Sequence, residues 1–198
     1  MKVALFGGTF DPPHNGHIAL LTLTRELFSP DRIVLSVSRN PLKASVLTPD
    51  THRLALAELL ADEINATGNI VEVNTRELRR KRPSYTIDTL KHLTSKYPNA
   101  DFLLCIGEDN YRNFSRWKSP EKILAMSQVA VFSRQLSDEK RPSFSLVQGS
   151  AVRYVKLDFS ISATDIRAAL SKGDDVSDKL PRSILRYIAA HGLYQAAL

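Results

Sequence analysis

The chain has 198 residues, of which 43% are hydrophobic and 24% charged, and these proportions are typical of one compact globular domain. Its apolar runs are too short to cross a bilayer and its N-terminus does not resemble a signal peptide, so we expect a cytoplasmic protein that does not enter the membrane. A net charge of +6 attracts nucleic acids, phosphorylated metabolites and nucleotides alike, and it does not choose among them.

Short β-rich segments alternate with helical patterns along the chain. We predict strands over residues 2–6, 32–38, 70–74, 101–106, 128–133 and 152–156. We predict helices over residues 17–28, 51–63, 85–96, 120–126, 163–171 and 181–191. This alternation favours an α/β fold with a Rossmann-like, doubly wound, mainly parallel sheet and helices on both faces. We expect a single domain, 1–198, in which residues 160–198 form a short C-terminal helical portion.

The first predicted strand leads into a glycine-rich turn, Gly7 to Thr9, and a helix is expected to begin near residues 15–17. Paired glycines let the backbone approach a ligand and adopt angles closed to other residues. A helix start attracts phosphate because its unpaired N–H groups and its dipole favour negative charge. His14 and His17 are close enough in sequence to face one anion there, and Gly16 keeps the approach clear. The pattern predicts a phosphate-binding site.

A metal site is the alternative role for these two histidines. Two histidines alone make a poor zinc site, and no third ligand lies at a nearby spacing. Cys105 is the only cysteine, so the chain offers neither an internal disulfide nor a cysteine cluster. Its apolar neighbours predict a buried core thiol. We therefore expect no metal ion held mainly by protein side chains.

A basic cluster, Arg76 with residues 79–82, precedes a predicted helix start whose N-cap is Ser84. The simplest interpretation of this cluster is a solvated loop, and a direct phosphate-holding role is the alternative. Further along, the segment 107–117 follows the strand that ends at residue 106. It therefore lies at the sheet edge where ligands bind. Trp117 ends this segment between two basic residues, which disfavours complete burial of its indole.

A second helix start lies at residues 161–167. Ser162 is a good N-cap, and Asp165 three positions later gives a variant of the capping box. Thr164 lies in the first turn, where its hydroxyl can meet an anion. Arg167 carries a planar donor fork suited to phosphate oxygens. Taken alone, this segment also fits an ordinary capped helix with a surface arginine.

These two segments together resemble the nucleotidyltransferase superfamily. The segment 9–17 is similar to its His-x-Gly-His motif, and the segment 162–167 is similar to its Ser-x-Thr-x-x-Arg signature. The two matches stand in the order that the superfamily has. The resemblance implies that His14 and His17 stabilise the α-phosphate and the departing pyrophosphate. It also implies that Thr164 and Arg167 hold the β- and γ-phosphates.

The middle of the chain resembles bacterial nicotinate-nucleotide adenylyltransferases. The shared features are a Ser-Tyr-Thr-x-Asp-Thr-Leu helix start, a Gly-x-Asp turn, a tryptophan, an Asn–Lys loop and the closing helix; here they are residues 84–90, 107–109, Trp117, 40–43 and 180–194. The resemblance covers essentially the whole chain. Two departures are the lead-in Lys81-Arg82-Pro83, which replaces a small, glycine-containing one, and Ala163, which replaces a frequent serine.

This resemblance implies transfer of AMP from ATP to nicotinate mononucleotide, giving nicotinate adenine dinucleotide and pyrophosphate in NAD biosynthesis. It implies Mg²⁺ as cofactor, held mainly by the phosphates. The partners are then ATP and nicotinate mononucleotide, without nucleic acid or membrane, and a homodimer stays open. The implied residues are catalytic His14, His17 and Arg167; ATP-binding Gly7, Gly8, Thr9, Gly16, Gly107, Asp109, Ser162 and Thr164; and substrate-binding Asn40, Lys43, Tyr85, Thr86 and Trp117.

The chemistry of the acceptor agrees with these residues. A pyridinium ring over the Trp117 indole gains on the order of 1–2 kcal/mol from stacking and cation–π attraction. Its ring carboxylate needs donors, which the N–H groups near Tyr85 and Thr86 can supply at a helix start. We therefore expect a preference for the acid over nicotinamide mononucleotide.

Two other functions stay open from the sequence. One is an adenylyl- or cytidylyltransferase for another phosphate such as phosphopantetheine, which the segment 84–90 and Trp117 disfavour. The other is a basic nucleic-acid-binding protein that keeps the fold without activity. No aromatic-interleaved basic stripe supports it, and the presence of His14, His17 and Arg167 argues against lost catalysis.

Overall fold

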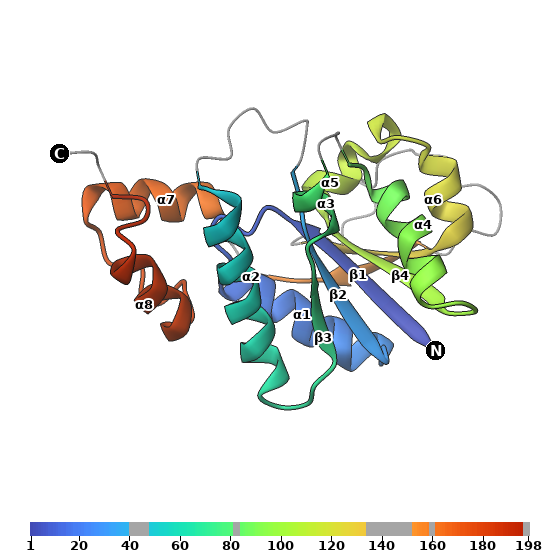
Figure 1. Cartoon of the computed structure of the whole chain (residues 1–198), viewed down its shortest axis with the longest axis horizontal. Coiled ribbons are helices and arrows are strands. Elements are labelled where there is room, and N and C mark those ends of the chain that lie inside the picture. The colour runs from blue at the N-terminus through green and yellow to red at the C-terminus, as the bar shows by residue number, and fades with distance from the viewer. Residues whose placement is uncertain (40–47, 81–83, 134–151, 159–160, 196–198) are drawn as a thin grey trace.

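The computed structural model describes residues 1–39, 48–80, 84–133, 152–158 and 161–195. A six-stranded sheet runs through the molecule, and the strands end at its upper edge in Figure 1. The strands are β1 (Lys2–Gly8), β2 (Arg32–Val37), β3 (Val71–Asn74), β4 (Asp101–Gly107), β5 (Gln128–Ser133) and β6 (Val152–Lys156). Their order is β3-β2-β1-β4-β5-β6 and each neighbouring pair is parallel. The order reverses direction between β1 and β4, where doubly wound sheets bind nucleotides.

The helices connect these strands and cover both faces of the sheet. They are α1 (Asn15–Phe28), α2 (Asp50–Asn65), α3 (Arg76–Arg79), α4 (Thr86–Lys96), α5 (Glu108–Arg112), the 3₁₀ helix η1 (Phe114–Arg116), α6 (Pro120–Met126), α7 (Ala163–Lys172) and α8 (Arg182–Ala190). In Figure 1, α1, α2, α7 and α8 lie on one side of the sheet, and α4 and α6 on the other. Within the described residues, no helix has both the length and the apolar character to cross a membrane.

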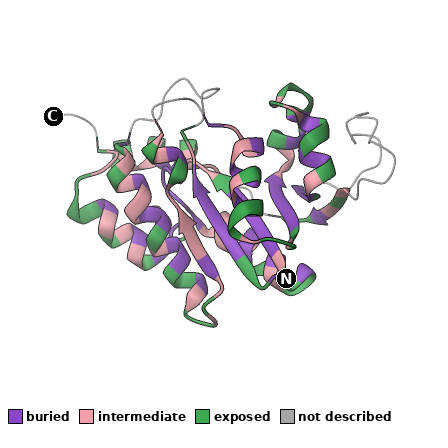
Figure 2. Ribbon diagram, turned by 45° about the vertical axis from the view of Figure 1, so that its right-hand side comes forward, coloured by how far each residue is buried: buried purple, intermediate pink, exposed green. Residues whose placement is uncertain are grey.

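Two hydrophobic cores form because successive side chains of a strand point to opposite faces. Phe6, Leu35 and Cys105 belong to the core beneath α1, α2 and the C-terminal helices. Leu5 and Leu104 belong to the core beneath α4 and α6. The central strands are therefore buried on both faces, as Figure 2 shows by their purple colour. This arrangement leaves the upper edge of the sheet as the place where a ligand can reach the backbone.

The C-terminal helices pack into the first of these cores. Ile166 of α7 and Ile184 and Ile188 of α8 are buried in the same cluster as the strands. Where α8 packs against α2, the Tyr187 hydroxyl lies 2.9 Å from Nδ1 of His52 on α2. The packing therefore fixes α7, whose N-cap is Ser162, against the body of the sheet.

The predicted architecture is confirmed, and some local predictions are wrong. Leu27, an apolar residue of the helix predicted over residues 17–28, is 56% exposed rather than buried. Thr24 takes the inner position instead, because its hydroxyl donates to the Leu20 carbonyl and lies 3.6 Å from Cys105 Sγ. Part of the basic cluster forms the short helix α3 rather than a loop. Ser84 is not the N-cap of α4: Tyr85 occupies that position.

Candidate active site

The loop between β1 and α1, residues 9–14, lies at the upper edge of the sheet. It follows β1, which lies between β2 and β4, and it ends at His14, the N-cap of α1. Asp11 and His14 are both buried, and so are the two prolines between them. The prolines restrict the backbone because their rings fix φ. The loop is therefore a defined support for the histidines.

The rings of His14 and His17 are in contact, tilted against each other, at the start of α1. Their ring centroids are 3.9 Å apart, with 35° between the ring planes. The His14 backbone N–H donates to His17 Nδ1 over 3.0 Å. A neutral His17 ring must then carry its proton on Nε2, which makes that atom a donor. The two rings predicted to face one anion are thus brought together.

His14 is a buried imidazole. Burial lowers its pKa from 6.5 to about 4, so the ring is neutral at neutral pH. Its Nδ1 has no hydrogen-bond partner among the described residues. Buried polar atoms are nearly always paired, and exceptions often mark functional positions. An anion bound beside this ring would favour its protonated form.

The glycines after β1 supply space rather than unusual angles. Gly7 and Gly8 lie within β1, and neither is among the residues with positive φ, so that part of the prediction is wrong. A Cβ at Gly7 would meet nothing within 4 Å, and a Cβ at Gly8 would come within 3.0 Å of the Phe10 ring. Gly7 therefore leaves bare backbone at the sheet edge, and Gly8 makes room for Phe10. The positive φ in this loop, 50°, belongs to Phe10 itself.

Arg167 reaches the same loop from α7. Its Nη1 donates to the Asp11 carbonyl over 2.7 Å, and its Nη2 lies 3.4 Å from Thr164 Oγ1. Ser162 is the N-cap of α7, as predicted, because its hydroxyl accepts from the Asp165 backbone N–H. The capping box differs, since the Ser162 hydroxyl donates to the Asp165 side chain instead. The two segments that resemble phosphate motifs therefore meet at residue 11.

A cavity of about 600 Å³ opens beside this loop. Its walls come from the ends of β1, β2 and β4, the start of α4 and the segment around η1. Tyr85, Thr86 and Trp117 line it together with Gly7 to Thr9, so most of the predicted acceptor residues share one space. Trp117 is half-buried, as its basic neighbours indicate, and its ring centroid lies 5.2 Å from that of Phe114.

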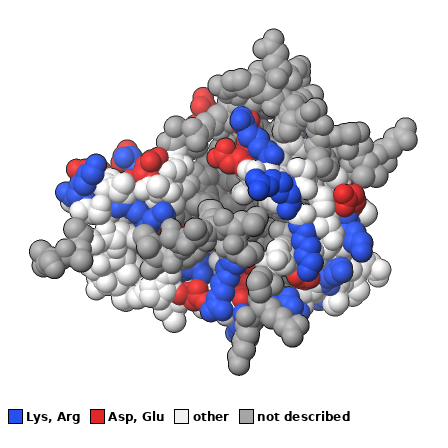
Figure 3. Space-filling model, turned by 90° about the horizontal axis from the view of Figure 1, so that it is seen from above, with Lys and Arg blue, Asp and Glu red and all other residues white. Residues whose placement is uncertain are grey.

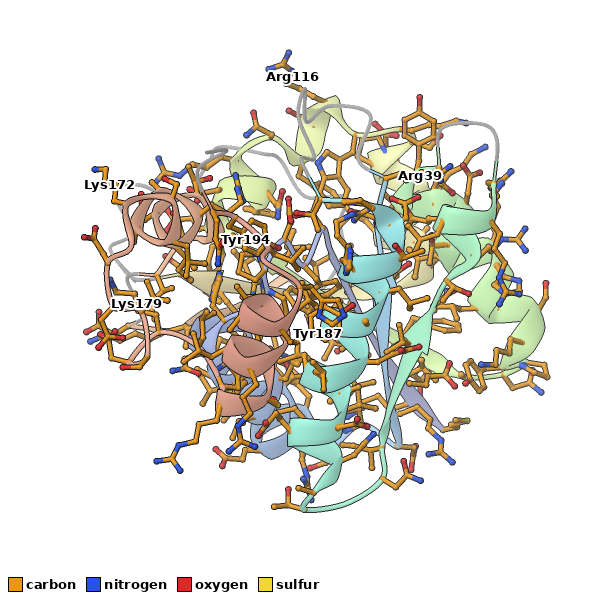
Figure 4. The ribbon with its side chains drawn as sticks, turned by 60° about the vertical axis from the view of Figure 1, so that its left-hand side comes forward. Arg39, Arg116, Lys172, Lys179, Tyr187 and Tyr194 are labelled. Carbon is orange, nitrogen blue, oxygen red and sulfur yellow. The ribbon has the colours of Figure 1, made fainter. Side chains whose placement is uncertain are left out.

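Cations gather around the mouth of this cavity. Lys118 Nζ lies 4.7 Å from the centroid of the Tyr85 ring, and Arg116 also lines the cavity. Figure 3 looks onto the upper edge of the sheet and shows a run of Lys and Arg side chains along its right-hand side, with others at the left and below. Figure 4 shows Arg116 extending outward from the body of the molecule. This distribution of charge favours an anionic ligand.

Glu77 lies on the wall of the cavity and was missed by the sequence analysis. It is buried, and it accepts hydrogen bonds from Ser36 and Thr89, each over 3.1 Å. Burial raises its pKa, while these hydroxyl donors act in the opposite direction. The carboxylate thereby ties β2 to α3 and α4. A serine inside the apolar run of β2 is the signal that could have pointed to a polar partner at this depth.

Arg53 is a second residue that the sequence analysis missed. Its side chain is 1% exposed, although it lies on α2, and its Nη1 donates to the carbonyls of Thr9 and Ser38 over 2.9 and 2.8 Å. Its Nη2 pairs with Asp50 over 2.5 Å. Arg53 therefore joins the segments that follow β1 and β2. Nothing in the local pattern distinguishes it from a surface arginine.

The remaining predicted residues are less closely connected to the cavity. Gly107 ends β4, and a Cβ there would meet nothing within 4 Å. Asp109 is exposed in the first turn of α5 and does not line the cavity. Gly16 is the second residue of α1, between the two histidines. Asn40 and Lys43 lie outside the described residues.

Neither the cysteine nor a metal cluster adds to the site in the described part of the chain. Burial raises the pKa of the Cys105 thiol to about 12, which keeps it protonated and unreactive in the core. No group of three or more His, Cys, Asp or Glu side chains within residues 1–39, 48–80, 84–133, 152–158 and 161–195 is arranged to hold a metal ion. The described residues at the site carry imidazoles, a guanidinium group, hydroxyls and backbone N–H groups.

Comparison with known proteins gives a consistent result. A family model described as cytidylyltransferase-like matches residues 5–169. A protein of Chloroherpeton thalassium named "probable nicotinate-nucleotide adenylyltransferase" is 50% identical over 194 residues, which is 98% of each chain. One of the same name from Chlorobium luteolum is 45% identical over the full length of both chains. In fold, Plasmodium falciparum nicotinic acid mononucleotide adenylyltransferase complexed with NaAD is similar with a TM-score of 0.75 at 20% identity, covering 98% of this chain and 97% of that one.

Proposed function

Since the chain belongs to the nicotinate-nucleotide adenylyltransferase family of cytidylyltransferase-like proteins, we propose that it transfers AMP from ATP to nicotinate mononucleotide. The products are nicotinate adenine dinucleotide and pyrophosphate, a step of NAD biosynthesis. One observation carries the proposal: the paired imidazoles and Arg167 converge on one loop beside a cavity that contains two aromatic rings. Such a site has separate places for a polyphosphate and for a ring.

The proposed triphosphate site lies at the start of α1. The attacking acceptor phosphate forms a bond to the α-phosphorus while the bond to the leaving pyrophosphate breaks, so the protein must position two reactants and stabilise negative charge. The Nε2–H of His17 is a donor to the α-phosphate, because Nδ1 is engaged by the His14 backbone. His14 is neutral in the free protein, and bound phosphates would raise its pKa and favour its protonated form. Arg167 and Thr164 bind the outer phosphates.

The proposed acceptor site is the cavity itself. The nicotinate ring stacks on Trp117, and its carboxylate accepts from the N–H groups at the start of α4 and faces Lys118. A neutral carboxamide gains less from these donors and from the cation, so the acid is the preferred substrate. Asn40 and Lys43 stay assigned to the acceptor phosphate, and Asp109 to the ribose of ATP, on the family resemblance.

Mg²⁺ is the proposed cofactor, and it would be held mainly by phosphate oxygens. This ion usually takes one or two carboxylates and completes its shell with phosphates and water. The described residues around the histidines offer donors and cations rather than clustered carboxylates, which fits a metal brought in by the nucleotide. When bound, Mg²⁺ neutralises charge on the leaving pyrophosphate. We further propose a single cytoplasmic domain, residues 1–198, that acts without nucleic acid or membrane.

Pyrophosphate release with ATP and Mg²⁺ tests the proposal across a panel of acceptors. The panel contains nicotinate mononucleotide, nicotinamide mononucleotide, phosphopantetheine and glycerol phosphate. We expect the highest kcat/KM for nicotinate mononucleotide and a lower one for its amide. Highest activity with phosphopantetheine or glycerol phosphate would assign the chain to another acceptor. No release with any acceptor, together with salt-sensitive RNA binding, would favour the inactive nucleic-acid-binding alternative.

A further inference from the structure

A tyrosine of the C-terminal segment contacts the loop between β1 and α1. The Tyr194 hydroxyl donates to Asp11 Oδ1 over 2.8 Å and also hydrogen-bonds with the Thr48 side chain. Thr48 precedes α2, and Asp11 lies between β1 and α1. One phenol therefore joins the C-terminal segment to two segments at the upper edge of the sheet. In Figure 4, Tyr194 lies closer to this edge than Tyr187 does.

Asp11 connects this tyrosine to the proposed triphosphate site. Its side chain accepts from Tyr194, and its backbone carbonyl accepts from Arg167 Nη1 over 2.7 Å. Asp11 is 3% exposed, so its carboxylate depends on protein donors rather than on bulk water. Two residues with ring-fixed φ, Pro12 and Pro13, separate it from His14. A shift of Asp11 would therefore move both the guanidinium and the paired imidazoles.

The conformation of Tyr194 indicates that this contact is specified. Its φ of 64° lies in the left-handed region, which costs on the order of 1 kcal/mol for a residue with a side chain. Burial raises its pKa, and the Asp11 carboxylate adds to the effect, so the hydroxyl stays protonated and remains a donor. The fold thus maintains a strained backbone at the residue whose hydroxyl reaches the loop.

From these contacts we infer that Tyr194 is a positioning residue for catalysis: its hydroxyl fixes Asp11, and through Asp11 it orients Arg167 and the loop that carries His14 and His17. The inference rests on the proposed function. Tyr194 itself does not touch the reacting atoms. Its contribution is the preorganisation of groups that must be placed before the phosphoryl transfer.

Matched removal of two hydroxyl groups tests this inference. Tyr194→Phe keeps the ring and loses the hydroxyl that donates to Asp11 and bonds with Thr48. Tyr187→Phe is the control, because it also deletes a part-buried hydroxyl hydrogen bond of the C-terminal region, to His52, away from the loop. We expect Tyr194→Phe to lower kcat about tenfold, with the KM for nicotinate mononucleotide within about twofold of wild type. Tyr187→Phe should leave kcat unchanged, and thermal unfolding measures the stability of both variants.

The same hydrogen bond can also be tested by substituting its other partner, Asp11. Asp11→Ala should lower kcat at least as far as Tyr194→Phe, and the double variant should be no slower than Asp11→Ala alone. A kcat of Tyr194→Phe within twofold of wild type, an equal loss in Tyr187→Phe, or losses that multiply in the double variant would overturn the inference. A wild-type protein that releases no pyrophosphate would instead refute the proposed function.

Discussion

At the scale of single residues, catalysis is expected to depend most on the His14–His17 pair. His17→Ala removes the Nε2 donor whose orientation the His14 backbone fixes. We expect turnover to fall by roughly 10³ or more, because a donor to developing phosphate charge has no substitute in alanine. His92→Ala, on α4, is the matched control and should keep full turnover. Pyrophosphate release and circular dichroism measure activity and folding. Near-normal turnover of folded His17→Ala would remove it from the mechanism.

The burial of His14 predicts a pH dependence of stability. The pKa of His14 is about 4 in the folded chain and returns to 6.5 on unfolding, because the ring is then no longer buried. Between these two pH values only the unfolded chain takes up the proton. Stability therefore falls as the pH drops through this range, by about 2 kcal/mol from this group between pH 7.5 and pH 5.

Urea unfolding of wild type and His14→Asn at these two pH values measures the effect. The variant lacks the titrating ring, so its stability should fall by about 2 kcal/mol less than that of wild type. The other ionisable groups contribute alike to both proteins. The same pH dependence in both would show that His14 is not the group that titrates.

Trp117 is expected to act on binding of the acceptor. Trp117→Ala removes the stacking surface of the cavity, so the KM for nicotinate mononucleotide should rise roughly tenfold. The KM for ATP serves as an internal control, since the indole lines the cavity rather than the start of α1. Steady-state kinetics with each substrate varied in turn separates the two. A rise in the KM for ATP alone would assign Trp117 to the nucleotide.

At the scale of elements, the upper edge of the sheet depends on Arg53 of α2. Arg53→Ala leaves the carbonyls of Thr9 and Ser38 without their donor, and we expect a loss of about 2–4 kcal/mol in unfolding free energy. Arg32→Ala is the control: Arg32 also donates to a backbone carbonyl, that of Asn69, but it is exposed. It should cost less than about 1 kcal/mol. Equal losses in chemical denaturation would contradict a special role for Arg53.

Elements were predictable where hydrophobic periodicity decided them. The predicted strands and long helices agree with the structure within a few residues, because neighbouring positions in the sequence are enough to reveal an apolar run or an amphipathic face. The short helices α3, α5 and η1 were not expected, since three to five residues carry no usable period. The inner position of Thr24 on α1 also could not be predicted, because it depends on Cys105, a residue of the distant strand β4.

In the candidate site, too, local motifs could be predicted and contacts between distant segments could not. The residues at positions 7–17 and 162–167 were identifiable because each group forms a local motif at a helix start. Glu77, Arg53 and Tyr194 were missed because their partners come from other elements: Ser36 and Thr89, Thr9 and Ser38, and Asp11. Such contacts become visible only when the sheet brings the segments together.

At the scale of the whole molecule, the order of the strands explains why distant motifs cooperate. The reversal of strand order between β1 and β4 opens the upper edge, and the loop after β1 lies there. The C-terminal helices pack on the first core and bring α7 against this loop. The acceptor cavity is formed on the other side of the loop by α4 and η1. The fold thus places the two proposed substrate sites next to one pair of histidines.

The identity of the dinucleotide product tests the central claim most directly. ATP labelled at the α-phosphate is incubated with Mg²⁺ and equal concentrations of nicotinate and nicotinamide mononucleotides, and the labelled products are separated. We predict that label moves into nicotinate adenine dinucleotide, which forms in clear excess over NAD. Label that stays in ATP, or that enters both dinucleotides equally, would contradict the account.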